Sequence, residues 1–248
     1  MSVHHVLAVL LAPLIGSFIG VVVERLPLGL SIIRGRSRCD HCFHELRPRD
    51  LVPLVSYLCQ RGRCSHCGEQ IRTFYPIVEL AAVLVAASAA IVLDGTLYWL
   101  SLGLGFCLLT LAFIDLRHLI LPDVLTLPLI LSGLAVAFHL RPEVIQSHII
   151  GAALGFLIFA GIAWLYRRLR GRDGLGLGDA KLLAAAGAWL GWEGLSGVVL
   201  LAATAAMVIV STRGVLGDRV NATTELAFGA YLALAFWISW LFGPLVVA

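Results

Sequence analysis

The chain has 248 residues, of which 60% are hydrophobic and only 13% are charged, and its formal net charge is +3. Soluble globular domains carry about 25% charged residues. Together with a mean hydropathy of +0.94, this composition excludes an ordinary soluble protein and indicates a protein embedded in a lipid bilayer.

Eight apolar stretches approach the roughly 20 residues that a helix needs to cross a bilayer. They predict an all-α integral membrane protein with about eight transmembrane helices. The first stretch lacks a preceding basic region and a small-residue cleavage pattern, so we expect it to be kept as a helix rather than removed as a secretory signal. In chain order the stretches cover residues 3–23, 76–93, 97–114, 124–140, 144–166, 180–192, 195–210 and 226–247.

Basic residues support this number of helices. With eight crossings, every one of the 18 lysines and arginines except Arg141 falls on the same side of the membrane. The positive-inside rule makes that side the cytoplasm, with both termini outside. The net charge of +3 therefore reports membrane topology, and no nucleic-acid partner is needed to explain it.

A polar insert, residues 24–75, follows the first apolar stretch and contains "CDHC" and, after residues 43–63, "CSHC". A tetrahedral zinc ion takes four thiolates, and two C-x-x-C pairs joined by a loop of about 15–20 residues are typical of such sites. The insert is too small to bury a large core, so the metal would supply folding free energy. The predicted ligands of this structural zinc ion are Cys39, Cys42, Cys64 and Cys67.

Two disulfides or a redox C-x-x-C are the other interpretations of these pairs. Disulfides are disfavoured on the reducing, cytoplasmic side, and a redox pair normally accompanies a βαβ pattern that this sequence lacks. Nearby His41, His44 and His66 are expected to be solvated loop residues. The sequence thus predicts three parts: a first helix (1–23), a zinc-binding insert (24–75) and a membrane core of seven helices (76–248).

Three of the aspartates lie at the cytoplasmic membrane boundary: Asp115, Asp123 and Asp179. Pro122 disfavours a continuous helix from Asp115 to Asp123, so these two need not share a helical face. Carboxylates from different helices can still converge on one water-accessible point. Two that share a proton can act as general base and general acid, which is the chemistry of aspartyl peptidases.

Asp179 stands in "GLGLGDAK", residues 174–181. Its simplest interpretation is a helix N-cap. However, glycines at 174, 176 and 178 also allow a close approach of another backbone, and an aspartate at the head of a membrane helix is typical of a wet functional cavity. Lys181 either stabilises a carboxylate, contacts substrate or extends to the interface.

These residues together resemble the type IV prepilin peptidases, a family of G-x-G-D aspartyl membrane proteases. The resemblance rests on "GSF" (16–18), "RLP" (25–27), the two C-x-x-C pairs, "YPIVE" (75–79), "FIDLRHLILPD" (113–123) and "GLGLGDAK". It implies that Asp115 and Asp179 are the catalytic pair and that the four paired cysteines hold zinc. Asp123 is then a structural carboxylate, or the replacement if Asp115 proves dispensable, and Glu79 is a candidate contributor to methyl transfer.

The resemblance also implies an activity and a location. The enzyme would remove a short basic leader from prepilin or pseudopilin precursors of a type IV pilus or type II secretion system, typically after a glycine. It would then N-methylate the new N-terminus with S-adenosylmethionine. The active site would face the cytoplasm from the bacterial inner membrane.

Two alternatives stay open. One is a peptidase without methyltransferase activity, because no G-x-G-x-x-G or other cosubstrate motif is present. The other is a zinc-stabilised membrane scaffold or transporter, in which the aspartates pair with arginines or bind ions.

Overall fold

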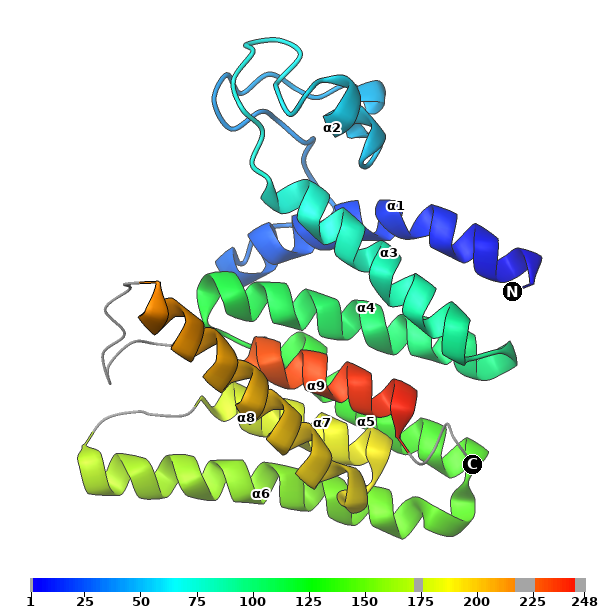
Figure 1. The fold of residues 1–248 in the computed structure, drawn as a ribbon, viewed down its shortest axis with the longest axis vertical. Coiled ribbons are helices and arrows are strands. Elements are labelled where there is room, and N and C mark those ends of the chain that lie inside the picture. The colour runs from blue at the N-terminus through cyan, green and yellow to red at the C-terminus, as the bar shows by residue number, and fades with distance from the viewer. Residues whose placement is uncertain (1, 172–175, 217–225, 244–248) are drawn as a thin grey trace. The chain divides into compact units, whose positions relative to one another are not determined.

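The structure, a computed structural model, describes residues 2–171, 176–216 and 226–243, and its regular secondary structure in these ranges is helical, while much of the insert is loop (Figure 1). Within them, each of the eight predicted apolar stretches coincides with one long helix, and the only β pairing consists of two isolated bridges in the insert. The predicted all-α class is therefore confirmed. The long helices are α1 (Val3–Arg25), α3 (Phe74–Val92), α4 (Gly95–His118), α5 (Asp123–Leu140), α6 (Ile145–Arg170), α7 (Leu177–Leu190), α8 (Trp192–Val215) and α9 (Phe228–Phe242).

The described ranges also contain four short helices. Three lie in or beside the insert, and the fourth precedes α6. They are η1 (Leu26–Leu28), η2 (Pro48–Leu51), α2 (Val55–Cys59) and η3 (Pro142–Val144).

Six of the long helices are long and apolar enough to cross a bilayer: α1, α3, α4, α5, α6 and α8. The chain is therefore a multi-pass membrane protein. The other two, α7 and α9, have 14 and 15 residues and span only about 21–23 Å at 1.5 Å per residue. Their crossing of the bilayer stays a prediction.

Helix ends differ from the sequence prediction in two places that matter for function. Helix α4 continues past the predicted end at residue 114, so Asp115 lies within its last turn. Helix α7 begins at Leu177 rather than at residue 180, with Gly176 as its N-cap. The N-cap interpretation of Asp179 is therefore wrong, because Asp179 is the third residue of the helix.

The chain divides into two compact units, Met1–Thr110 and Leu111–Ala248. In the first unit α1 packs against α3 at Gly16. A Cβ atom added to Gly16 would lie 2.6 Å from Glu79 Cα and 3.0 Å from Ala82 Cβ. Such distances are shorter than van der Waals contact, so the two helices approach this closely only because Gly16 has no side chain.

In the second unit α7 lies among α5, α6, α8 and α9 (Figure 1). Nearly all of its residues from Asp179 to Leu190 are buried, and most of them are alanine, glycine or leucine. Helix α6 approaches the backbone of α7 through glycines. A Cβ added to Gly155 would lie 2.6 Å from Leu183 O, and one added to Gly151 would lie 2.7 Å from Gly187 O. Close packing of small residues is the usual way in which membrane helices associate.

This packing predicts that Gly155→Ala destabilises the protein, because the new methyl group collides with the carbonyl of Leu183. Overpacking of this kind costs about 1–3 kcal/mol, which would lower the thermal unfolding midpoint of the purified protein in detergent. Gly161→Ala is the matched control on the same helix, since a Cβ there meets nothing within 4 Å. Equal midpoints for the two variants would contradict the close approach of α6 to α7.

Candidate functional site

The carboxylate of Asp115 lies in the last turn of α4 and is only 5% exposed. Its Oδ2 accepts a hydrogen bond of 2.9 Å from the backbone N–H of Ala230. Ala230 is in the first turn of α9, where backbone N–H groups have no partner within the helix. The N-terminus of α9 therefore supplies a donor that fixes the Asp115 side chain.

The carboxylate of Asp179 lies in the first turn of α7 and is 8% exposed. Its Oδ2 would lie 3.6 Å from a Cβ placed on Gly176, the N-cap of the helix. Two glycines of the sequence pattern therefore lie at the start of α7: Gly176 is its N-cap, and Gly178 precedes Asp179 in its first turn. Gly174 lies outside the described residues.

The two carboxylates meet at Gly229 of α9. A Cβ atom at Gly229 would lie 2.9 Å from Asp179 Oδ1 and 3.0 Å from Asp115 Oδ2. The two oxygens are therefore separated by no more than the sum of these distances. Three helices, α4, α7 and α9, converge here, and any residue other than glycine at 229 would push against both aspartates.

Leu121 covers this meeting point. Its Cδ1 would lie 2.8 Å from the Cβ of a residue at 229, and its Cβ 2.9 Å from that of a residue at 178. Leu121 is itself 8% exposed. The sequence predicted a water-accessible point of convergence, whereas both carboxylates are buried. Leu121 packs beside them, against Gly178 and Gly229.

Asp123 does not join Asp115 and Asp179. It is the first residue of α5, and its Oδ1 forms an ion pair with Nζ of Lys181 in α7 at a distance of 2.5 Å. The Asp123 side chain is 58% exposed and that of Lys181 is 25% exposed, so the pair contributes little to stability by itself. Of the predicted roles for Lys181, the structure supports contact with a carboxylate, and that carboxylate is Asp123.

The four cysteines of the insert form a cluster in which all Sγ atoms lie within 4.8 Å of one another. Cys39 Sγ and Cys67 Sγ are 3.9 Å apart. A tetrahedral zinc ion with Zn–S bonds of about 2.3 Å separates its sulfur ligands by about 3.8 Å. All four are free thiols, so the cluster could hold a metal ion of this geometry.

Two of these thiols have shifted pKa values. Backbone N–H groups of Cys42 and His41 hydrogen-bond Cys39 and lower its pKa to about 7. The Glu69 backbone also lowers the pKa of Cys67, but desolvation and hydrogen bonds to the other three sulfurs outweigh this and raise it to about 12. Four crowded thiols therefore resist ionising together, and a divalent cation would remove that resistance.

Glu79 lies in α3 and is buried, with Oε2 accepting a hydrogen bond of 2.7 Å from the backbone N–H of Leu54. Leu54 has a positive φ of 59° and precedes α2. A second connection runs through Arg72, which pairs with Asp40 at 2.8 Å and with Glu24 at 3.5 Å. These contacts attach the insert to α1 and α3, so the structure gives Glu79 a structural role; methyl transfer stays a prediction.

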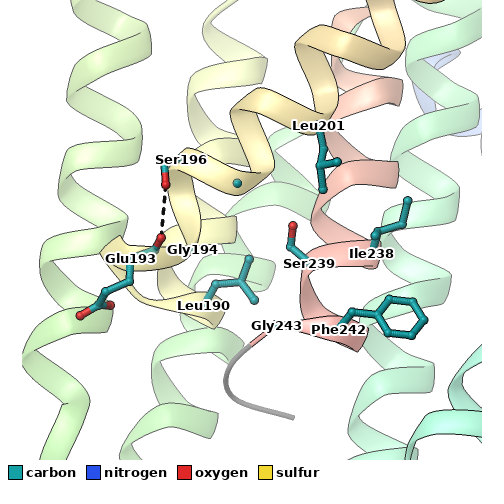
Figure 2. A pocket seen from close by; sticks show the side chains of 10 residues that line it. Leu190, Glu193, Gly194, Ser196, Leu201, Ile238, Ser239, Phe242 and Gly243 are labelled. Atoms are coloured by element: carbon teal, nitrogen blue, oxygen red, sulfur yellow. Dashed lines mark hydrogen bonds between the residues drawn. The ribbon is translucent and has the colours of Figure 1, made fainter. Parts of the chain in front are cut away.

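A separate hollow of about 330 Å³ is lined by residues of α7, α8 and α9 (Figure 2). It lies at the C-terminal ends of α7 and α9, whereas Asp179 is in the first turn of α7. Its lining includes Leu190 of α7, Glu193 and Leu201 of α8, and Ile238 and Phe242 of α9. Leu190 is eleven positions beyond Asp179, which corresponds to about 16 Å along the helix. The hollow is therefore not part of the site formed by the aspartates.

Comparison with known proteins assigns the sequence to a family. Residues 10–93 match the bacterial peptidase A24 N-terminal domain, and residues 102–211 match the type IV leader peptidase family. No solved structure matches the chain. Three similar proteins are each named prepilin leader peptidase/N-methyltransferase. The one from Burkholderia pseudomallei is 40% identical over 91% of this chain and 81% of its own length. Those from Aeromonas hydrophila and Pseudomonas aeruginosa are 36% and 37% identical, over 96% and 95% of this chain and 90% and 89% of their own lengths, respectively.

The chain belongs to the type IV leader peptidase family. Asp115 and Asp179 both lie within the range matched by the type IV leader peptidase model, and the four cysteines lie within the range matched by the N-terminal domain. Gly229 and Ala230 lie beyond both ranges. Sequence reasoning missed these two residues and Leu121, because they reach the aspartates only through the fold; the glycine in "AFGAY" near the head of an apolar stretch was the available signal.

The cysteine cluster predicts that this leader peptidase, purified without chelators, carries one metal ion per chain. Cys64→Ser should lose that metal, because the buried Cys64 sulfur is one of the four ligands. Cys59→Ser is the matched control, since Cys59 is exposed and outside the cluster. Metal content measured by mass spectrometry tests this, and full occupancy in Cys64→Ser would contradict it.

Proposed function

We propose that the chain is an aspartyl endopeptidase that removes the basic leader from type IV prepilin-like precursors, with Asp115 and Asp179 as the catalytic pair. The observation that carries this proposal is the convergence of the two carboxylates on the space at Gly229. The printed name of the relatives, prepilin leader peptidase/N-methyltransferase, supplies the substrate class.

The pair can perform hydrolysis if it holds one proton. The ionised carboxylate takes a proton from a water molecule as the water oxygen bonds to the scissile carbonyl carbon. The protonated carboxyl gives its proton to the leaving nitrogen, and the C–N bond breaks. The products are a leader with a new carboxylate and a mature protein with a new amino terminus, and the pair again holds one proton.

Asp115 is the better fixed of the two, because Ala230 N–H donates to its Oδ2. A backbone donor does not swing away as a side chain can, so it holds the carboxylate in one orientation while the substrate binds. Asp179 is positioned by the first turn of α7, which is enclosed by neighbouring helices.

The active site is proposed to face the cytoplasm from the bacterial inner membrane. Arginines 167, 168 and 170 in the last turn of α6 immediately precede the segment that leads to Asp179. This placement supports a cytoplasmic site under the positive-inside rule. The partners would be prepilin or pseudopilin precursors, whose basic leaders remain in the cytoplasm while their apolar helices enter the bilayer.

Zinc is the metal proposed for the four cysteines, since a tetrahedral thiolate set favours it. Methylation of the new amino terminus is proposed as a second activity, because the relatives carry both names. S-adenosylmethionine would supply an electrophilic methyl group to that amine. A peptidase without this activity remains the alternative, while membership of a peptidase family disfavours the scaffold and the transporter.

The test is cleavage of a purified prepilin-like precursor in detergent by the wild type, Asp115→Asn and Asp179→Asn. Both substitutions keep the shape of the side chain but remove its proton chemistry, so each should reduce the rate at least about 1,000-fold. Asp123→Asn is the matched control and should retain most activity, because Asp123 is exposed and pairs with Lys181, whereas Asp115 and Asp179 are buried.

The mass of the mature product reports the second activity in the same experiment. An increase of about 14 Da over the unmodified amino terminus corresponds to one methyl group and requires added S-adenosylmethionine.

The proposed mechanism would be overturned if Asp115→Asn or Asp179→Asn had normal thermal stability and cleaved the precursor at the rate of the wild type.

A further inference from the structure

The zinc-binding insert contains an uncharged stretch whose apolar side chains are exposed. It covers residues 51–59, "LVPLVSYLC", and includes the last residue of η2 and all of α2. Its side chains of Leu51, Val52, Val55 and Leu58 are between 41% and 73% exposed. Exposed apolar side chains gathered in one place usually mark a contact with another protein or with a membrane.

The position of this stretch is set by Glu79 of α3. The backbone N–H of Leu54, the residue before α2, donates to Glu79 Oε2 at 2.7 Å. Glu79 in turn packs against Gly16, where an added Cβ would lie 2.6 Å from Glu79 Cα. Gly16 is in the interior of α1, which continues through residues 17–25. Helix α2 therefore begins beside the middle of α1 rather than beyond its end (Figure 1).

For a helix that crosses the bilayer, the middle of α1 lies below the membrane surface. The nine residues of α1 after Gly16 are about 14 Å long at 1.5 Å per residue. The whole of α1, with 23 residues, is about 35 Å long, only slightly more than the roughly 30 Å of the hydrocarbon core. A point about 14 Å inside the end of α1 is therefore at the depth of the acyl chains. Side chains that are exposed beside this point face lipid rather than water.

The backbone of the stretch is suited to such surroundings. The N–H groups of residues 56, 58 and 60 donate to the carbonyls four positions earlier, at 2.9–3.0 Å. Gln60 Nε2 donates to Asp50 Oδ1 at 2.9 Å, which ties together the two polar ends of the stretch. Paired backbone groups are the main requirement for a segment in lipid. Because nine residues are too few to cross a bilayer, the stretch can lie only in one leaflet.

Arginines flank the stretch on both sides. Arg47 and Arg49 precede it, Arg61 follows it, and all three are exposed. Arg36, elsewhere in the insert, pairs with Glu45 at 2.9 Å, whereas these three form no ion pair with a described residue. Arginines beside an apolar membrane element extend to the head-group layer, where anionic phospholipids attract them.

We propose that residues 51–59 are embedded in the cytoplasmic leaflet and that Arg47, Arg49 and Arg61 bind anionic phospholipid head groups around them. The exposed apolar side chains contact acyl chains, as in other helices that lie in the plane of a membrane interface. The insert is then attached to the bilayer as well as to α1 and α3. Membrane binding of this kind does not depend on the proposed peptidase activity.

The test uses the full chain in nanodiscs that contain equal amounts of phosphatidylcholine and anionic phosphatidylglycerol. Photoreactive benzoylphenylalanine replaces Leu58 in one variant and Ser65 in the matched control. Ser65 is also exposed, but it begins the polar stretch "SHCGEQ" of the second C-x-x-C pair. After irradiation, mass spectrometry should detect phospholipid adducts at position 58 and none at position 65. Thermal unfolding midpoints equal to that of the wild type show that both variants are folded.

The composition of the adducts at position 58 tests the role of the arginines. They should contain at least about fivefold more phosphatidylglycerol than phosphatidylcholine, which is the effect of one arginine near an anionic surface. Arg47→Gln combined with Arg61→Gln should bring this ratio towards one. Arg36→Gln is the matched control and should leave the ratio unchanged, because Arg36 already pairs with Glu45.

The proposal would be overturned if position 58 gave no lipid adduct, or if position 65 gave as much as position 58. A cross-link from position 58 to the second unit of the chain or to a second copy would also overturn it, because protein would then cover the stretch. A ratio that the arginine substitutions leave unchanged would refute the binding of head groups. None of these results bears on the catalytic pair, which is tested by Asp115→Asn and Asp179→Asn.

Discussion

The backbone N–H of Ala230 reaches the Asp115 carboxylate across 115 positions of sequence because residue 229 has no side chain. This contact holds the last turn of α4 against the first turn of α9, and Asp179 of α7 reaches the same point. The remaining features of the site follow from it. Both carboxylates are buried, Leu121 packs over them, and the proposed catalytic pair is set by backbone geometry rather than by flexible side chains.

The same constraint explains the composition of α7. A helix surrounded by α5, α6, α8 and α9 has little room for side chains, and glycines on α6 bring its backbone against that of α7. Such packing leaves Asp179 little freedom to move relative to α9. Burying a carboxylate in these surroundings is costly, and ionisable residues kept at such positions usually have a function, which agrees with the role proposed for the pair.

Much of the fold could be predicted from the sequence because the bilayer imposes long apolar stretches that are visible without a structure. The start of α7 was predicted three residues late, since Gly176 and Gly178 are typical of a loop and only the packing of α7 shows them to be an N-cap and a helical residue. The four cysteines could also be predicted, because their spacing is local. The contacts of Gly229, Leu121 and the Lys181–Asp123 pair could not, because each joins residues far apart in the chain.

Gly229→Ala tests the central claim, convergence of the two aspartates on this one position, most directly. The rate of cleavage of a prepilin-like precursor should fall about 100-fold or more, because the added methyl group displaces both carboxylates and a misplacement of about 1 Å can have that effect. The thermal unfolding midpoint of the variant shows whether it is folded. A folded Gly229→Ala protein that cleaves at the wild-type rate would contradict the account.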